Sequence, residues 1–372
     1  MKELNLISKL ISFDTQSHKN NKEIVGYIAS LFPTEFITLI PLKNGDLDLY
    51  NLELKINGKS DQNPLIFSGH TDTVPTSSKW TRDPFQAKLV DGKVYGLGSS
   101  DMKAGVAAMI LLAQWILDNK IVPENDIYFL FDCDEEVDGT GGKDFASRHN
   151  FTNASVIVAE PTNCELQVGQ KGVFELKVTV LGQAFHSSTT SLEKNRKFNA
   201  IHKAMAIIQE LEKLEEKFEQ NKDELFNTPT QAVCTIQGGT APNVIPDKCQ
   251  FSLNRRVLPN ENIDEVIAEF KQTIFSVDNE AIIEVGFSGN ANLVDQDSDF
   301  MKECIKVSEK VLGEAKISVM TGWTQAGLFN KWGNCLIWGP GDMTMAHQAD
   351  EYCPLDQIGA MVECYKRLVI SY

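Results

Sequence analysis

The sequence predicts an α/β protein with a mostly parallel sheet and a second, inserted α+β domain. Short apolar runs such as PLIFSG, IYFLF and VIVAE are typical of strands that are buried on both faces, as in parallel sheets. In the first part of the chain these runs alternate with helical patterns. A middle segment instead alternates apolar and polar residues strictly, which indicates strands with one solvated face.

Helical patterns begin and end the parallel part of the chain. The N-terminal pattern places four apolar residues on one helical face, namely Leu4, Ile7, Leu10 and Ile11. A long apolar helix, DMKAGVAAMILLAQWIL, begins near Met102. After about Gly289 the buried-strand character returns with CLIWGP, and a last helix is expected over residues 355–370. Both ends of the chain therefore belong to the same parallel layer.

The middle segment has its own order of elements. It reads as a strand (VFELKVTVLG), a charged helix over 199–226, two strands (QAVCTIQGG and CQFSLNRRVL), a helix (NIDEVIAEFKQTIF) and a strand (AIIEVGFSG). This β-α-β-β-α-β order predicts a ferredoxin-like antiparallel sheet with helices on one face. The expected domains are residues 1–172 and 290–372 for the parallel part and 173–289 for the insertion.

Composition excludes several classes of partner. The chain of 372 residues carries a net charge of -16, which argues against nucleic acid and anionic membranes as partners. No run of about 18 apolar residues predicts a membrane span, and the N-terminus lacks the apolar core of a signal peptide. The eight cysteines are scattered without a C-x-x-C pair, so we expect reduced thiols and a cytoplasmic protein.

Metal-type residues follow the predicted buried strands. In open α/β sheets, ligands collect outside the carboxyl ends of the strands. Two histidines and three carboxylates occupy such positions or open the long helix: His70, Asp101, Glu136, Glu160 and His347. This mixture indicates a hydrolase that uses two cations.

The neighbours of these residues fit the same interpretation. Asp72 lies two residues after His70 on an extended segment and so faces the same side, where it can accept the second imidazole N–H. Asp101 has two oxygens with which to bridge two cations. Glu135 and Glu136 point in different directions, so one can bind metal while the other transfers protons. Buried adjacent acids repel each other, and a cation relieves that cost.

Each of these residues also has a plainer explanation. His70 fits a surface histidine beside a turn, Asp101 fits a favourable charge at a helix N-terminus, and Glu135 with Glu136 fits a solvated loop. The segment GLGSSD resembles a dinucleotide-binding loop, but its sixth position is Asp101 instead of glycine. The broken motif disfavours a nicotinamide-dependent dehydrogenase.

Taken in order, nine segments of the chain resemble the dinuclear zinc aminoacylase and metallopeptidase family. That family includes acetylornithine deacetylase, succinyl-diaminopimelate desuccinylase and glutamate-releasing carboxypeptidases. The segments are SGHTDTVP, YGLGSSDMKAG, DEEVDGTGG, AEPTN, GQKGVFELKV, GQAFHSS, GGTAPNVIPDKC, RRVLP and GPGDMTMAHQADEY. The resemblance covers nearly the whole chain. It implies a zinc-dependent exopeptidase-like α/β domain, an inserted lid domain and a homodimer formed through that lid.

The resemblance also implies roles for individual residues. Two zinc ions per chain are expected, with Co²⁺ as a substitute. The implied ligands are His70, Asp101 and Glu160 for one ion and Asp101, Glu136 and His347 for the other. Glu135 is the implied general base, Asp72 the partner of His70, and His186 the lid residue that polarises the scissile carbonyl, often from the other subunit. The implied substrate-binding residues are Asn243, Arg256, Lys171 and Thr324.

Within the family, GGTAPNVIPDKCQF and AHQADEY resemble acetylornithine deacetylase most. Desuccinylases tend to carry two consecutive arginines where this chain has Gln170 and Lys171, and an arginine would suit a succinyl carboxylate better. Trp323 and Gln325 stand where a small residue and an acid are commoner, which leaves the acyl group and side chain open. The expected reaction is hydrolysis of an N-acyl amino acid, with N-acetylornithine as the first choice.

Three alternatives remain beside this expectation. The same site suits a succinyl-diaminopimelate desuccinylase, and it equally suits a dipeptidase or carboxypeptidase. A catalytically silent relative would only bind a small acylated ligand or a partner protein. That last alternative is disfavoured because all the implied ligands and the base are present.

Overall fold

The chain forms two compact units. The computed structural model describes residues 1–372, except for the side chain at position 219. Unit 1 comprises Met1–Gly169, Asn292–Met320 and Thr324–Tyr372, and unit 2 comprises Gln170–Ala291 and Thr321–Trp323. Both ends of the chain therefore lie in unit 1, and the short segment 321–323 groups with unit 2, which no sequence pattern indicates.

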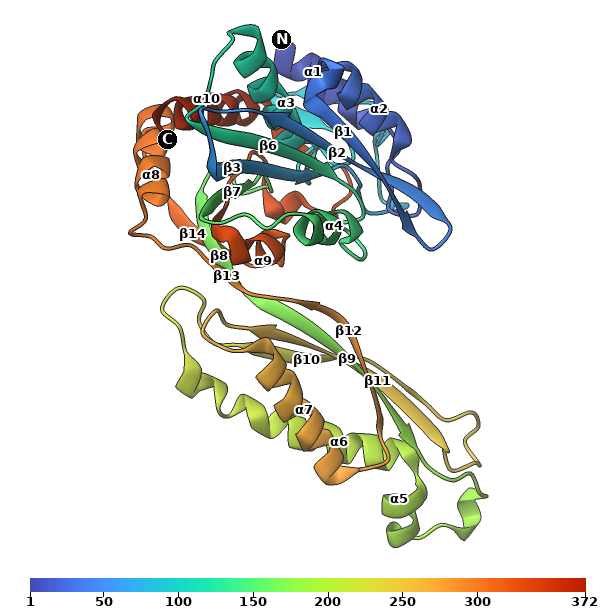
Figure 1. Ribbon diagram of the computed structural model, residues 1–372. Helices are drawn as coiled ribbons and strands as arrows, with labels where there is room; N and C mark the ends of the chain where they lie inside the picture. Colours follow the sequence, from blue (N-terminus) through green and yellow to red (C-terminus); the bar gives the residue numbers. More distant parts are fainter. The chain divides into compact units, whose positions relative to one another are not determined.

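Unit 1 is built on a nine-stranded sheet (Figure 1). The strands follow the order β1-β2-β6-β3-β7-β15-β8-β13, and β14 pairs with β8. The central pairs β3–β6, β3–β7 and β7–β15 are parallel, whereas β1–β2, β2–β6 and β8–β15 are antiparallel. The strands are β1 (Ile37–Asn44), β2 (Leu47–Ile56), β3 (Ser60–His70), β6 (Asn125–Asp132), β7 (Ala154–Val158), β8 (Leu166–Gln170), β13 (Asn292–Leu293), β14 (Ile317–Met320) and β15 (Gly333–Ile337). The prediction of an α/β layer with a mostly parallel core is confirmed.

Helices cover both faces of this sheet. One face packs against α1 (Lys2–Ile11), α2 (Lys22–Ser30), α3 (Lys103–Asp118), α8 (Asp299–Leu312) and α10 (Leu355–Ser371). The other face packs against α4 (Thr140–Arg148) and α9 (Ala326–Phe329). Successive residues of β3 enter opposite cores: Phe67 joins the first and Ile66 the second. This is why the central strands read as continuous apolar runs instead of alternating ones.

The helix α3 approaches the sheet closely at a glycine. A Cβ atom added at Gly105 would lie 2.0 Å from the carbonyl oxygen of Ala159, so only glycine allows this contact. The contact sets the start of α3 against the residue that precedes Glu160. Asp101 and Glu160, far apart in sequence, are thereby placed at the same edge of the sheet.

Two helical glycines should respond to alanine in opposite directions. Gly26, in α2, is exposed and has no atom within 4 Å of an added Cβ, so Gly26→Ala should stabilise the fold by about 0.5–1 kcal/mol. Gly105→Ala should destabilise it, by about 1–3 kcal/mol or more, because the backbone of Ala159 must shift. Urea unfolding of both variants would measure the two free energies. Equal changes in the two variants would contradict this packing.

Unit 2 is the inserted α+β domain. Its sheet runs β10-β11-β9-β12, and every neighbouring pair is antiparallel. Two helices, α6 and α7, pack on one face of this sheet, as Figure 1 shows. The elements are β9 (Gly172–Leu181), α5 (Leu192–Phe198), α6 (Ala200–Glu215), β10 (Thr230–Gly238), β11 (Lys248–Val257), α7 (Ile263–Val277) and β12 (Ile282–Gly289). This is the predicted ferredoxin-like order.

One predicted helix is shorter than expected. The helix predicted over 199–226 ends at Glu215, and a 3₁₀ turn at Phe218–Asn221 follows. The Asp223 carboxylate then accepts hydrogen bonds from the backbone N–H groups of Leu225 and Phe226, which satisfies the backbone outside a helix. The charge pattern of the sequence alone did not reveal that the Asp223 side chain competes with the helix for these backbone N–H groups.

A small sheet of β4 (Lys88–Val90), β5 (Lys93–Tyr95) and β16 (Tyr352–Pro354) lies apart from the large one. The eight cysteines carry free thiols, seven of them buried. Within the described residues, no helix combines the length and apolarity that crossing a lipid bilayer requires.

Candidate metal centre

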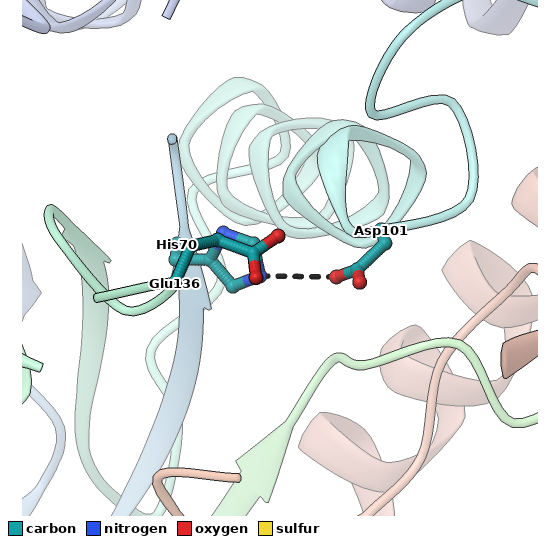
Figure 2. A group of neighbouring side chains, drawn as sticks. All are labelled: His70, Asp101 and Glu136. Atoms are coloured by element: carbon teal, nitrogen blue, oxygen red, sulfur yellow. Dashed lines mark hydrogen bonds and ion pairs between the residues drawn. The ribbon is translucent and has the colours of Figure 1, made fainter. Parts of the chain in front are cut away.

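The carboxyl ends of the parallel strands bring the predicted ligands of unit 1 together. His70 is the last residue of β3, Asp101 lies in the turn before α3, and Glu136 lies in the turn after β6. Figure 2 shows the side chains of His70 and Asp101 pointing toward each other. Parallel strands all end at one edge of the sheet, which is why residues distant in sequence meet here.

His70 is the buried centre of this group. Its Nε2 atom lies 3.1 Å from Oδ1 of Asp101 and 3.7 Å from Oε1 of Glu160. Its Nδ1 atom lies 3.0 Å from the backbone oxygen of Asp72 and 3.8 Å from a carboxylate oxygen of the same residue. With Nδ1 donating to Asp72, Nε2 is left as the nitrogen that faces the acids.

The second histidine approaches from the other side of Asp101. Nε2 of His347 lies 3.0 Å from Oε2 of Glu136 and 3.5 Å from Oδ2 of Asp101. The hydrogen bond with Glu136 raises the pKa of His347 to about 8. The two oxygens of Asp101 therefore face different histidines, Oδ1 toward His70 and Oδ2 toward His347.

The carboxylates of the site are buried together. Burial, and then repulsion from Asp101, raises the pKa of Glu160 well above its usual range. Burial also raises the pKa of Glu135 well above its usual range, with the adjacent Glu136 adding to the rise. For Asp101 burial acts in the same direction, but the hydrogen bond with His70 and the attraction to His70 and His347 together outweigh it and leave the pKa of Asp101 lowered. Without further positive charge, this arrangement of acids is costly.

The donor set fits divalent cations. In each of two groups of residues, all the ligand atoms lie within 4.8 Å of one another. The groups are His70, Asp101 and Glu136, and His70, Glu135 and Glu160. Oε1 of Glu136 is buried and has no hydrogen-bond partner among the described residues. Histidine nitrogens with carboxylate oxygens suit zinc. An orphaned carboxylate oxygen among buried acids is what a bound cation would satisfy.

Asp72 contacts more than His70. Its carboxylate accepts the backbone N–H groups of Glu135 at 3.3 Å and of Glu136 at 3.2 Å. The side chain thereby orients the turn that carries both glutamates. This contact was not evident in the sequence, because Asp72 follows β3 whereas Glu135 follows β6, 63 residues later.

Three further buried groups near the site escaped the sequence analysis. Glu351 accepts backbone N–H groups of the loop that ends at Asp101. Asp132, whose pKa burial raises to about 7, accepts a hydrogen bond from Gln325 at 2.9 Å. Lys103 donates to the backbone oxygen of Phe13, and burial lowers its pKa to about 8. Only the position of Glu351, close after His347 in a quoted segment, could have drawn attention to it.

The remaining predicted residues are distributed over both units. Thr324 lies buried in unit 1, where its hydroxyl accepts the N–H of Ala326. In unit 2, Lys171 directly precedes β9, and Arg256 pairs with the start of that strand. His186 and Asn243 lie beyond the other end of β9, where the backbone oxygen of Asn243 accepts the N–H of Ser187. The ten residues of β9, at roughly 3.3 Å each, separate the two pairs by about 30 Å.

Relatives of known name match almost the whole chain. The chain is 30% identical to an acetylornithine deacetylase from Buchnera aphidicola, over 98% of this chain and 95% of the relative. It is 27% identical to a probable succinyl-diaminopimelate desuccinylase from Staphylococcus aureus, over 100% and 97% of the two chains.

Solved structures share the fold. A tripeptidase from Staphylococcus aureus superposes with a TM-score of 0.80 at 19% identity, covering 99% of this chain and 97% of the other. A dinuclear metal-binding peptidase of the M20 family from Bacillus subtilis gives 0.70 at 14% identity, covering 99% and 96%. Residues 66–371 match the model of peptidase family M20/M25/M40. The chain is therefore a hydrolase that belongs to peptidase family M20/M25/M40.

Proposed function

We propose that this protein hydrolyses the amide bond of an N-acyl amino acid, with N-acetylornithine as the preferred substrate and two zinc ions as cofactors. The observation that carries the proposal is the placement of Asp101, whose two oxygens face His70 at 3.1 Å and His347 at 3.5 Å. One carboxylate between two histidines, with Glu136 and Glu160 beside them, suits a pair of cations.

The ligand assignment is the one that the family resemblance implies, and the distances from the two histidines to the carboxylates support it. His70, Asp101 and Glu160 would hold one ion, and Asp101, Glu136 and His347 the other, so that Asp101 bridges. When bound, the two cations supply Lewis-acid chemistry, lowering the pKa of water from about 15.7 toward roughly 7 and polarising the carbonyl. Co²⁺ prefers similar ligands and is expected to substitute.

Glu135 is the proposed general base. Its carboxylate lies with the ligand atoms of His70 and Glu160, and Asp72 holds its backbone N–H. It would take one proton from the attacking water as the new C–O bond forms. The same carboxyl group would then deliver that proton to the leaving nitrogen as the C–N bond breaks. The products are a carboxylate and a free amino acid.

Unit 2 would supply the groups that recognise the substrate. Burial and the nearby positive charges of Arg255 and Arg256 lower the pKa of Lys171, and Nη1 of Arg256 is buried without a hydrogen-bond partner among the described residues. Such a guanidinium suits the α-carboxylate of an amino acid. His186 is exposed, and its Nδ1 is hydrogen-bonded to Ser188; it would stabilise the oxyanion. Asn243 beside it and Thr324 in unit 1 would help to orient the substrate.

A homodimer through unit 2 is part of this proposal. His186 and Arg256 lie near opposite ends of β9 and cannot line one pocket within a single copy of unit 2. A second copy would solve this by bringing its own His186 to the site. The edge strands β10 and β12 expose apolar side chains suited to such contact: Val233, Ile236, Ile282 and Val285.

The variant His186→Ala should keep its fold and zinc content but lose turnover. An oxyanion donor acts mainly in the transition state, so kcat should fall by roughly 10²–10³-fold with little change in KM. Mixing His186→Ala with Glu135→Gln protein should restore some activity if subunits exchange and the donor crosses between them. An unchanged kcat in His186→Ala would remove this residue from the mechanism.

The substrate is tested with a panel of three compounds at equal zinc loading. We expect kcat/KM for N-acetylornithine to exceed that for N-succinyl-diaminopimelate and for dipeptides, because Gln170 and Lys171 replace the paired arginines suited to a succinyl group. Preference for the succinyl compound would favour a desuccinylase. Preference for dipeptides would favour a peptidase, the activity named for the tripeptidase of the same fold.

A further inference from the structure

A single buried carboxylate holds the loop that carries Asp101. Oε2 of Glu351 accepts the backbone N–H of Gly98 at 2.8 Å. Oε1 accepts the backbone N–H of Ser100 at 2.6 Å and of Asp101 itself at 2.8 Å. Both oxygens are thus committed to the backbone of one short turn, which leads directly into α3.

The backbone around Glu351 strengthens the same connection. The backbone oxygen of Glu351 accepts the N–H of Gly96 at 3.0 Å. The next residues form β16, which pairs with β5 immediately before the loop. Main chain and side chain together therefore attach the segment 351–354 to the segment 93–101.

Glu351 is buried, and its carboxyl group is nevertheless fully hydrogen-bonded. Only 2% of its surface is exposed. A buried carboxyl group needs hydrogen-bond partners that replace its lost hydration, and three backbone N–H donors supply them here. The residue is not among the ligand groups that cluster at the proposed metal centre.

The position of Glu351 links two parts of the centre. Glu351 lies in the same loop as His347, and its carboxyl group accepts the backbone N–H of Asp101, which faces His347. A shift of this carboxylate would change the separation between Oδ2 of Asp101 and Nε2 of His347, which is 3.5 Å. Both residues are proposed to hold the same cation, so their separation would affect how well it is bound.

We infer that Glu351 is a positioning residue for the two-cation centre, setting Asp101 through its backbone so that both oxygens of Asp101 bridge the cations. This inference rests on the proposed metal centre. Groups that orient metal ligands typically contribute roughly 10–100-fold to metal affinity. Glu351→Gln should therefore weaken zinc binding by about that factor. The amide keeps the size but turns one acceptor into a donor that faces a backbone N–H.

The test compares four proteins in the metal-free state and after addition of zinc. They are the wild type, Glu351→Gln, Glu351→Asp and the control Asp350→Asn. Asp350 is the neighbouring acid, but it binds the N–H of Thr81 at 3.0 Å and the side chain of Arg82 at 3.2 Å, away from the Asp101 loop. Zinc affinity is measured by competition with a chelator. Thermal unfolding of the metal-free proteins reports any loss of fold, independently of activity.

We expect both Glu351 variants to bind zinc more weakly than the wild type, and Asp350→Asn to bind it normally. Equal zinc affinity in all four proteins would overturn the inference. It would also be overturned if the Glu351 variants melted earlier without zinc yet bound zinc as tightly as the wild type, because the role would then be structural only. Failure of the wild type to bind zinc would instead overturn the metal centre itself.

Discussion

Glu135→Gln is expected to lower kcat by roughly 10²–10⁴-fold while the protein keeps its zinc. The glutamine has the same size, and the backbone N–H of this residue stays bound to Asp72. What is lost is the carboxylate that accepts a proton from water and returns it to the leaving nitrogen. Steady-state kinetics on N-acetylornithine and elemental analysis of the same sample would measure both quantities.

The adjacent residue is the matched control for that experiment. Glu136 lies 3.0 Å from Nε2 of His347 and has one buried oxygen without a partner, so it is assigned to metal. Glu136→Gln should therefore release one zinc ion. If Glu135→Gln lost zinc and Glu136→Gln retained it, the two assignments would be reversed.

Asp101→Asn should reduce activity to background, because it affects both cations. An asparagine offers one neutral oxygen, whereas the carboxylate of Asp101 faces His70 with one oxygen and His347 with the other. Zinc content should fall from two ions per chain to one or none. Equilibrium dialysis against a known zinc concentration would count the ions.

Asp138→Asn is the control for the loss of one negative charge. Asp138 is exposed and lies in the same turn as Glu136, where it accepts a hydrogen bond from Asn44. This variant should keep two ions and wild-type activity. Equal loss of zinc in Asp101→Asn and Asp138→Asn would show that net charge, and not bridging, controls binding.

Much of this site was predictable because its residues follow buried strands. His70 ends β3, and Glu160 follows β7 closely, so the apolar runs before them already placed both at one edge of the sheet. The same reasoning identified the inserted domain, because its alternating strands differ from the continuous apolar runs of the large sheet. The spacing of apolar residues along a strand shows whether one face or both faces of that strand are buried, and this distinguishes the two sheets.

The contacts that escaped prediction join a side chain to a distant segment of the chain. Asp72 holds the turn of Glu135 and Glu136, and Glu351 holds the loop of Asp101. A carboxylate that binds backbone N–H groups leaves no trace in the sequence of the segment it holds. The hydrogen bond between Gln325 and Asp132 escaped prediction for the same reason, because nothing in the sequence around either residue specifies a partner far along the chain.

The segment around Trp323 shows a similar limit. The indole nitrogen donates to the backbone oxygen of Asn290 at 3.0 Å, and the ring packs against Gly289 and Phe287. This contact explains why residues 321–323 group with unit 2. A sequence comparison marks the tryptophan as unusual at this position, but only the fold shows that it packs beside the end of β12.

The number of zinc ions that the metal-free wild type binds tests the central claim most directly. Titration calorimetry with zinc, followed by an activity assay on the same sample, would provide that number. Two ions per chain, with hydrolysis absent before the titration and present after it, is the predicted result. Full hydrolytic activity in the metal-free protein would contradict the proposed two-cation centre at His70, Asp101 and His347.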